Sequence, residues 1–332
     1  MITYVERRPR QTRDCERIWA VSDGRAGNAR QAEALAAVLS PRVEVLHVEP
    51  RAPWRWVAPR RLPVSACAFG DAFTAHLGAP PDLAIGCGRQ AALATRLAGA
   101  RGARTVQILD PRIDPRLWDL VVVPEHDTLR GPNVLVARGS LHPVDDAWLA
   151  DARAAFPALG ALRGPRIAVL LGGDSRHGRF DVAAFDAIAD RLDAIATRDG
   201  ASLLLTASRR TAPAVREAMR ARYAGRAALA WIDERDGPNP YAGMLGWADR
   251  IVCSADSVNM LSEACATRVP VFVFAPGAID GAPQRFVDGL IATGRVRAFD
   301  DALPAFDVVP LRETARIAAE VRTRLSLTSC AA

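Results

Sequence analysis

The chain of 332 residues contains no lysine, so all 43 of its basic residues are arginines. The net charge of +6 is spread along the sequence apart from short runs at 7–10 and 60–61, and no basic stretch is interleaved with aromatic residues. Nucleic-acid binding is therefore not expected. No apolar run approaches the ~20 residues of a membrane-spanning helix, and the N-terminal residues lack the apolar core of a signal peptide. We expect a cytoplasmic protein, and peripheral contact with the inner membrane stays open because basic patches are attracted to anionic lipids.

Several motifs for cofactors and metals are also missing. The six cysteines form no Cys-x-x-Cys pair, and several lie in apolar runs, which is typical of reduced thiols rather than of disulfides or a zinc site. The five histidines show no metal-ligand spacing. No glycine turn ends in the Gly-Lys-Ser/Thr of a P-loop. We therefore expect neither a metal nor a tightly bound cofactor.

What the sequence does contain is a regular alternation of short apolar runs and helical patterns, which predicts an α/β fold. We expect two doubly wound, Rossmann-like domains that face a cleft. The predicted parts are a loose tail at 1–16, a first domain at 17–143, a linker at 144–164, a second domain at 165–309, a C-terminal helix at 310–326 and a tail at 327–332.

The segment 251–276 is the centre of the second domain. It reads as a buried strand at 251–253, a small polar turn at 254–257, a helix, and a second buried strand at 271–274. A helix that starts at the carboxyl end of a parallel strand suits a phosphate, and the hydroxyls of Ser254 and Ser257 add donors there. The Glu263 carboxylate could accept hydrogen bonds from ribose hydroxyls. The alternative is an ordinary helix capped by Ser257 and Asp256, with Glu263 exposed.

Two further junctions of the second domain carry candidate phosphate ligands. The glycine pair Gly172-Gly173 follows a predicted strand at 166–171, and Arg176, His177 and Arg179 add positive charge beside it. The strand at 202–206 ends near Ser208, Arg209 and Arg210, where ligands bind in open α/β sheets. A plain glycine turn and a solvated arginine pair are the alternatives.

The first domain has a glycine turn at 22–28, which would let a ligand approach the backbone closely or would simply be a tight turn. A second turn fits G-x-G-x-x-A at 86–91, but it is not the first strand–helix unit, which argues against a dinucleotide site. Arg89 there could hold an anion. His126 and Asp127 are the best acid–base candidates, although a loop histidine is an equally ordinary interpretation. The segment 50–63, with two tryptophans and four arginines, could contact an acceptor or a membrane, or could pack its tryptophans on the core.

Several of these motifs resemble one family in the same order along the chain. Residues 247–249, 255–264 and 270–271 look like the elongated-mitochondria (mitochondrial fission) family, which is GT-B-like in fold, and the motifs at 24–31, 88–89, 107–112, 208–211 and 236–241 also match. Ser257, Glu263 and Gln284 are similar to residues of GT-B glycosyltransferases, including the peptidoglycan N-acetylglucosaminyl transferase. In such folds the C-terminal helix often crosses back to the first domain.

This resemblance implies two sets of site residues. Nucleotide and donor binding falls to Gly172, Gly173, Ser208, Arg209, Arg210, Asn239, Ser254, Asp256, Ser257, Asn259, Met260, Glu263 and Gln284. The acceptor side of the cleft falls to Gly24, Gly27, Asn28, Gln31, Gly88 and Arg89.

The function that we expect is a metal-independent glycosyltransferase of cell-envelope or lipopolysaccharide synthesis. It would use a nucleotide-diphosphate sugar as substrate and a lipid or glycan as acceptor. Arg209, Arg210 and Ser257 would stabilise the leaving diphosphate, and His126 or Asp127 would act as the base. A non-catalytic adaptor of the mitochondrial-fission type and a sugar-nucleotide epimerase are the alternatives.

Overall fold

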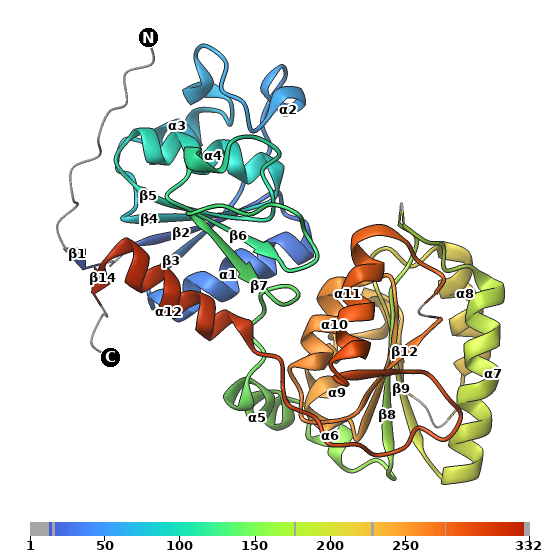
Figure 1. Cartoon of the computed structure of the whole chain (residues 1–332). Coiled ribbons are helices and arrows are strands. Elements are labelled where there is room, and N and C mark those ends of the chain that lie inside the picture. The colour runs from blue at the N-terminus through green and yellow to red at the C-terminus, as the bar shows by residue number, and fades with distance from the viewer. Residues whose placement is uncertain (1–12, 15–16, 176, 227–228, 276, 329–332) are drawn as a thin grey trace. The chain divides into compact units, whose positions relative to one another are not determined.

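The computed structural model describes residues 13–14, 17–175, 177–226, 229–275 and 277–328, and the chain forms two compact units (Figure 1). The first unit comprises Met1–Pro143 and Glu313–Ala332, and the second comprises Val144–Arg312. Each unit is built around its own six-stranded parallel sheet.

The sheet of the first unit has the order β3-β2-β4-β5-β6-β7. Its strands are β2 (Ile18–Ser22), β3 (Val43–His47), β4 (Leu83–Cys87), β5 (Arg104–Ile108), β6 (Leu120–Pro124) and β7 (Val134–Ala137). The order reverses between β2 and β4, so the first unit has a topological switch point at the carboxyl ends of these two strands.

The helices of the first unit are α1 (Ala26–Leu39), α2 (Trp54–Val57), η1 (Ser65–Cys67), α3 (Asp71–His76), α4 (Arg89–Ala100), η2 (Pro115–Leu117) and α12 (Glu313–Leu325). Helix α12 comes from the far end of the chain and lies against α1 (Figure 1). Its apolar face of Ile317, Ala318 and Val321 is fully buried in the same core as Leu35 of α1.

The sheet of the second unit has the order β10-β9-β8-β11-β12-β13, which is the 3-2-1-4-5-6 order of dinucleotide-binding folds. Its strands are β8 (Arg166–Leu171), β9 (Ser202–Ala207), β10 (Leu229–Trp231), β11 (Arg250–Ser254), β12 (Val271–Phe274) and β13 (Val296–Ala298). The switch point falls between β8 and β11, which pair directly from Arg250 opposite Ile167 to Cys253 opposite Leu170.

The helices of the second unit are α5 (Asp146–Ala155), α6 (Pro157–Gly160), α7 (Val182–Asp199), α8 (Pro213–Tyr223), η3 (Glu234–Asp236), α9 (Tyr241–Trp247), α10 (Val258–Cys265) and α11 (Gly281–Ala292). Strand β8 shows why helices cover both faces of the sheet. Ala168 and Leu170 point into one buried cluster, whereas Ile167, Val169 and Leu171 point into another. A strand that is apolar on both faces needs a helix layer on each side.

Parts of the predicted linker and of both predicted tails form regular secondary structure. Residues 146–160 form α5 and α6, which pack against α9, because the apolar side chains of Leu149 and Leu159 are buried in the second unit's core. Within the predicted tails, β1 (Arg13–Asp14) pairs in parallel with β14 (Leu327–Thr328), so backbone hydrogen bonds order both segments. The other residues of both tails lie outside the described residues. No helix within the described ranges is both long and apolar enough to cross a bilayer.

Candidate functional site

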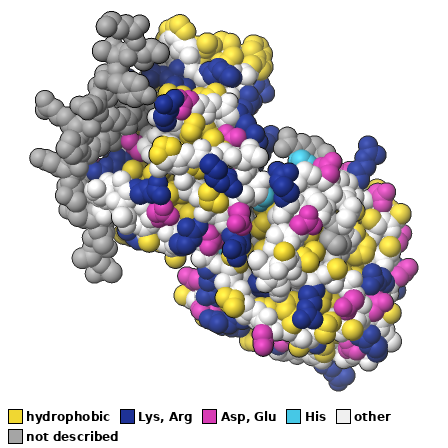
Figure 2. Space-filling model, in the orientation of Figure 1, with side chains coloured by type: hydrophobic (Ala, Val, Ile, Leu, Met, Phe, Trp, Pro, Cys, Tyr) yellow, Lys and Arg dark blue, Asp and Glu magenta, His cyan; other side chains and the backbone are white. Residues whose placement is uncertain are grey.

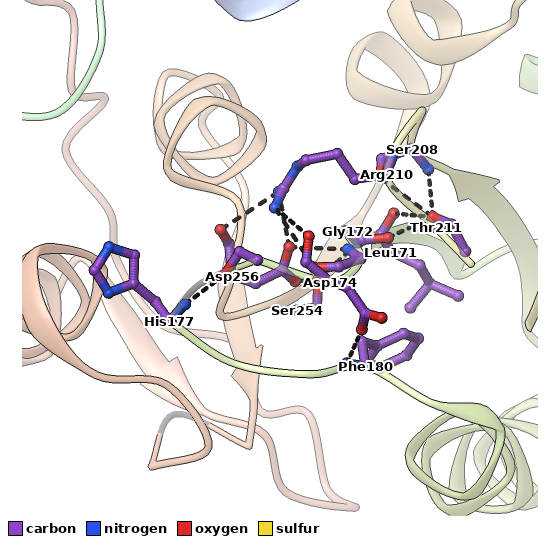
Figure 3. Close-up of polar contacts among 12 residues, drawn as sticks. Leu171, Gly172, Asp174, His177, Phe180, Ser208, Arg210, Thr211, Ser254 and Asp256 are labelled. Carbon is purple, nitrogen blue, oxygen red and sulfur yellow. Dashed lines mark hydrogen bonds and ion pairs between the residues drawn. The ribbon is translucent and has the colours of Figure 1, made fainter.

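The second unit gathers its candidate residues at the carboxyl ends of β8, β9 and β11 (Figure 3). The loops that follow these strands contribute Gly172 and Gly173, Ser208 to Thr211, and Ser254 to Ser257. They are up to 85 residues apart along the chain, and only the parallel pairing of β9, β8 and β11 brings them together. This edge, at the switch point, is where ligands bind in open α/β sheets.

The glycine pair after β8 is required by close packing. A Cβ on Gly172 would lie 2.1 Å from an Asp256 carboxylate oxygen, and a Cβ on Gly173 would lie 2.2 Å from the main-chain oxygen of Arg210. Both distances are far below van der Waals contact. The glycines therefore let three loops meet at one point, which a plain surface turn would not need.

Asp256 is the hub of this junction, with only 6% of its side chain exposed. One carboxylate oxygen accepts hydrogen bonds from the Gly173 amide at 2.9 Å and from Arg210 Nη2 at 2.8 Å. The other oxygen accepts a hydrogen bond from the Ser254 hydroxyl at 2.7 Å. Ser254 Oγ in turn accepts a hydrogen bond from the Gly172 amide at 2.7 Å. A buried carboxylate is stable only when it is paired and hydrogen-bonded in this way.

The two arginines after β9 have different surroundings. Arg210 bridges the loops, because besides Asp256 it donates to the main-chain oxygens of Gly173 and Asp174 at 3.4 Å. Thr211, which the sequence did not single out as a site residue, donates to Gly172 and fixes the same turn. Arg209 is exposed, and its guanidinium forms no ion pair within the described part of the chain. Of the predicted pair, Arg209 is thus the cation available to a ligand, while Arg210 is already engaged.

The start of α10 is not capped by a side chain. Ser257 occupies the N-cap position but makes no side-chain hydrogen bond to the helix, and Asp256 is committed to Gly173, Arg210 and Ser254. The interpretation of 256–257 as an ordinary cap is therefore wrong. The first amides of α10 and the positive end of its dipole lie at the switch point, and such groups favour an anion.

Glu263 is buried with 4% exposure, so the expectation of an exposed glutamate is also wrong. Its carboxylate accepts a hydrogen bond of 2.6 Å from the Tyr241 hydroxyl. Tyr241 begins α9, and its amide donates to the side chain of Asn239, an exposed residue of the loop at 236–240. Tyr241, which was not among the predicted site residues, thus connects this loop to α10. Tyr241 is the last residue of the family-like motif at 236–241, and that match is the signal in the sequence that could have singled it out.

The other predicted residues of the second unit lie around this centre. Asn259 and Met260 are half-buried in the first turn of α10, and Gln284, in α11, donates to Asp288 at 2.7 Å. His177 lies 2.7 Å from Asp280 through Nδ1, and in Figure 3 its ring points away from the Arg210–Asp256 pair. Arg179 is exposed, and Arg176 lies outside the described residues.

A buried arginine supports α10 from its other end. The guanidinium of Arg295 donates to the main-chain oxygens of Ala264, Cys265 and Thr267 at 2.9 to 3.3 Å. Burial lowers the pKa of Arg295 and raises the pKa of the neighbouring Cys265 thiol to about 12. A cation at a helix C-terminus is favourable, so Arg295 holds the helix whose N-terminus forms the site. Nothing in the local pattern around Arg295 predicts an arginine inside the core.

In the first unit the turns after β2 and β4 meet at the switch point. Asn28 donates to Asp23 at 2.9 Å and accepts from the Cys87 thiol at 3.7 Å. Gly88 has φ of +89°, and a Cβ there would lie 2.6 Å from Nδ2 of the Asn28 side chain. Gly24 and Gly27 lie in the same turn and at the start of α1. The structure thus places these two motif turns side by side.

Two of the predicted acceptor residues make hydrogen bonds within the first unit. Gln31 is buried, donates to Gly27 and accepts the Leu141 amide at 3.4 Å. Arg89 donates to the main-chain oxygens of residues 55, 56 and 58 at 3.2 to 3.4 Å, so it fastens the tryptophan-containing segment to α4.

His126 and Asp127 follow β6, at the same edge of the sheet as Gly24 and Gly88. The side chain of Asp127 accepts the Thr128 amide at 3.0 Å, and Arg130 donates to the main-chain oxygens of Glu125 and Asp127. These hydrogen bonds hold the loop at 125–130 in one conformation. Among the described residues, no three His, Cys, Asp or Glu side chains cluster so that they could hold a metal ion.

Two parallel six-stranded sheets with helices on their faces define a GT-B-like fold, as the sequence predicts. Solved structures share it: the UDP-GlcNAc 2-epimerase of Methanocaldococcus jannaschii is 10% identical, with a TM-score of 0.58 over 92% of this chain and 99% of that one. S. aureus MnaA, solved with UDP, is 14% identical, with a TM-score of 0.51 over 94% and 98% of the two chains.

The family model for mitochondrial fission ELM1 matches residues 26–325, so the chain belongs to that family. Mitochondrial fission protein ELM1 of Arabidopsis thaliana is 29% identical over 276 residues, which cover 74% of this chain and 64% of the plant protein. Uncharacterized protein RP120 of Rickettsia prowazekii (strain Madrid E) is 23% identical over 93% of this chain and 99% of its own. The chain thus spans less than two thirds of the length of the plant relative and nearly all of the rickettsial one.

Proposed function

We propose that this protein binds a nucleotide-diphosphate sugar in its second unit and transfers the sugar to a lipid or glycan acceptor. The observation that carries the proposal is the uncapped N-terminus of α10 at the switch point. Neither Ser257 nor Asp256 caps it, and unsatisfied helix amides beside tightly packed glycines suit a diphosphate.

The diphosphate would lie against the first turn of α10, within reach of Ser257 and Arg209. Arg209 is an exposed arginine at this edge that forms no ion pair within the described residues, and charge-assisted hydrogen bonds from an arginine would stabilise a leaving diphosphate. Asp256 repels an anion, but its pairing with Arg210 at 2.8 Å offsets that charge.

The nucleoside would lie between Asn239 and α10. The Tyr241–Glu263 hydrogen bond of 2.6 Å already joins these two elements, and a carboxylate so oriented can accept a hydrogen bond from a ribose hydroxyl. Gln284 would face the sugar. The base for the acceptor hydroxyl would come from His126 or Asp127 of the first unit. The acceptor itself, and a place in cell-envelope glycan synthesis at the inner membrane, belong to the same proposal.

An epimerase is the second candidate, because the solved structures of this fold include UDP-GlcNAc 2-epimerases, one of them with UDP-GlcNAc and UDP bound. An epimerase would use the same donor site without any acceptor. A non-catalytic adaptor is the third, in keeping with the fission proteins of the family. It would not need an occupied site.

Isothermal titration calorimetry with UDP, ADP, GDP and their sugar derivatives tests the proposal directly. We expect one nucleoside diphosphate to bind the wild type, and Arg209→Gln to weaken it roughly tenfold, the loss of one charge-assisted hydrogen bond of about 1.5 kcal/mol. Arg163→Gln is the matched control, since Arg163 is also exposed and lies in the same unit.

The outcomes separate the candidates. Release of nucleoside diphosphate only in the presence of an acceptor supports the transferase, whereas conversion of the nucleotide sugar to an isomer without release supports the epimerase. Absence of binding to every nucleotide would reject both and favour the adaptor. Equal weakening by Arg209→Gln and Arg163→Gln would place the ligand elsewhere.

A further inference from the structure

The segment 51–68 of the first unit, here called the Trp56 lobe, is unlike the rest of the described surface. It contains α2 and η1, and it connects β3 to α3. Its inner side is buried: Ala58 and Ala68 lie in the core cluster with Phe73, and Trp54 packs against that cluster. The lobe is therefore a folded part of the unit.

Arginines of α4 hold the backbone of the lobe in place. Arg89 donates to the main-chain oxygens of Arg55, Trp56 and Ala58, and Arg96 donates to that of Pro59 at 2.7 Å. At the other end, the Arg51 amide donates to the oxygen of Ala68 at 2.8 Å. These contacts fix which side chains the lobe turns outward.

The outward side chains are apolar at their centre. Trp56 is 69% exposed and Val64 is 71% exposed, more than any other large apolar residue of the described chain except Val309. Val64 also has φ of 59°, in the left-handed region that a β-branched residue rarely adopts. The Val64 carbonyl accepts the Cys67 amide at 3.0 Å as η1 begins, and strained backbone of this kind clusters at functional sites.

The charged residues of the lobe itself all have one sign. Between Glu49 and Asp71 the chain has no acidic residue, whereas Arg51, Arg55, Arg60 and Arg61 are all exposed. None of the four forms an ion pair within the described residues. Figure 2 shows basic and hydrophobic side chains next to one another over α2, at the top of the view.

We infer that the Trp56 lobe is a docking surface for an anionic lipid bilayer. Tryptophan is favoured at the boundary between hydrocarbon and headgroups, and unpaired arginines beside it are attracted to anionic headgroups. A second copy of the chain fits this surface poorly, since a symmetric contact would bring four arginines against four others. Two exposed apolar side chains are also too few for the core of a stable protein interface.

Co-sedimentation with vesicles tests this inference. We expect the full chain to bind vesicles of equimolar phosphatidylcholine and phosphatidylglycerol, and not vesicles of phosphatidylcholine alone. Arg60→Gln with Arg61→Gln should weaken binding roughly thirtyfold, since each arginine near an anionic surface contributes roughly a factor of five. Val64→Ser should weaken it about tenfold through lost apolar burial, and high salt should weaken binding of the wild type.

Matched controls share the chemistry but lie elsewhere. Val309→Ser alters the other highly exposed valine, at 83% exposure, and Arg101→Gln with Arg163→Gln removes two exposed arginines. These variants should bind as the wild type does, and circular dichroism should show all variants folded.

Equal loss in lobe and control variants, or absence of binding to anionic vesicles, would overturn the inference. Self-association that Val64→Ser abolishes, without any vesicle binding, would overturn it in favour of a second copy. Because the lobe is separate from α10, Arg209→Gln should leave vesicle binding unchanged even if nucleotide binding fails.

Discussion

Replacing Asp256 by asparagine should lower stability and raise anion affinity at the same time. The two side chains have nearly the same shape, so the change removes a charge without creating a cavity. The carboxylate accepts three hydrogen bonds, from Gly173, Arg210 and Ser254. An amide offers one oxygen, and its NH₂ group cannot accept.

The magnitude follows from these contacts. With the amide oxygen placed toward Gly173 and Arg210, the hydrogen bond from the Gly173 amide becomes a neutral one, the bond from Arg210 loses its anionic acceptor, and the Ser254 hydroxyl proton loses its acceptor. Weakening the buried bond to Gly173 costs about 1 kcal/mol, and the orphaned hydroxyl proton about 1 kcal/mol more. Arg210 is 42% exposed and can be hydrated, so its part is small. The expected loss in free energy of unfolding is about 2 kcal/mol.

The affinity of Asp256→Asn for a nucleoside diphosphate should increase. Removing a negative charge beside the proposed diphosphate site reduces repulsion and releases Arg210, so a nucleoside diphosphate should bind several-fold more tightly. Urea unfolding followed by circular dichroism measures the first effect, and calorimetry well below the unfolding transition measures the second. Asp301→Asn is the control, because that exposed carboxylate pairs with Arg191 at the surface and its loss should cost no more than about 1 kcal/mol.

Two results would refute this reasoning. Unchanged stability of Asp256→Asn would mean that the Asp256 contacts do not hold the three loops together. A fall in diphosphate affinity, with the variant fully folded, would mean that the α10 N-terminus is not the anion site.

Three further predictions concern stability and reactivity. Gly173→Ala should destabilise the protein by at least about 2 kcal/mol, because its Cβ would meet the backbone at 2.2 Å, whereas Gly289→Ala, with open space inside α11, should stabilise it slightly in urea unfolding. Burial opposes ionisation of Asp249, but hydrogen bonds from Arg166 outweigh it and lower its pKa. The ionised Asp249 therefore adds to the free energy of unfolding above its unfolded-state pKa of about 4, and this stabilisation is lost as pH falls. In Asp249→Asn the free energy of unfolding should consequently decrease less on acidification than in the wild type. Buried thiols with raised pKa values should resist alkylation until unfolding, as mass spectrometry of peptides would show for Cys87, Cys253 and Cys265.

Local pattern was enough to predict the core of the second unit. The apolar run at 271–274 coincides with β12, and the polar turn at 254–257 does separate β11 from α10. Patterns of this kind depend on residues a few positions apart, which the sequence displays directly. The ordered motifs also pointed to the fission family, which the match over 26–325 confirms.

Side-chain partners across the sheet could not be predicted in this way. Arg209 and Arg210 are neighbours of the same type, yet only Arg210 reaches Asp256. Gln31, Arg89 and Glu263 are polar residues in plausible motifs, and the structure uses the first two for internal hydrogen bonds and buries the third.

The sequence by itself determined the α/β class, the position of the strand–turn–helix units and the family. The tertiary structure decided which polar groups form hydrogen bonds within the protein and which are left exposed for a ligand. The physical reason is the order of the strands: residues 173, 210 and 256 become neighbours only because β9, β8 and β11 pair side by side. Periodicity along the chain specifies that each strand is buried, but it does not specify which strand lies next to which.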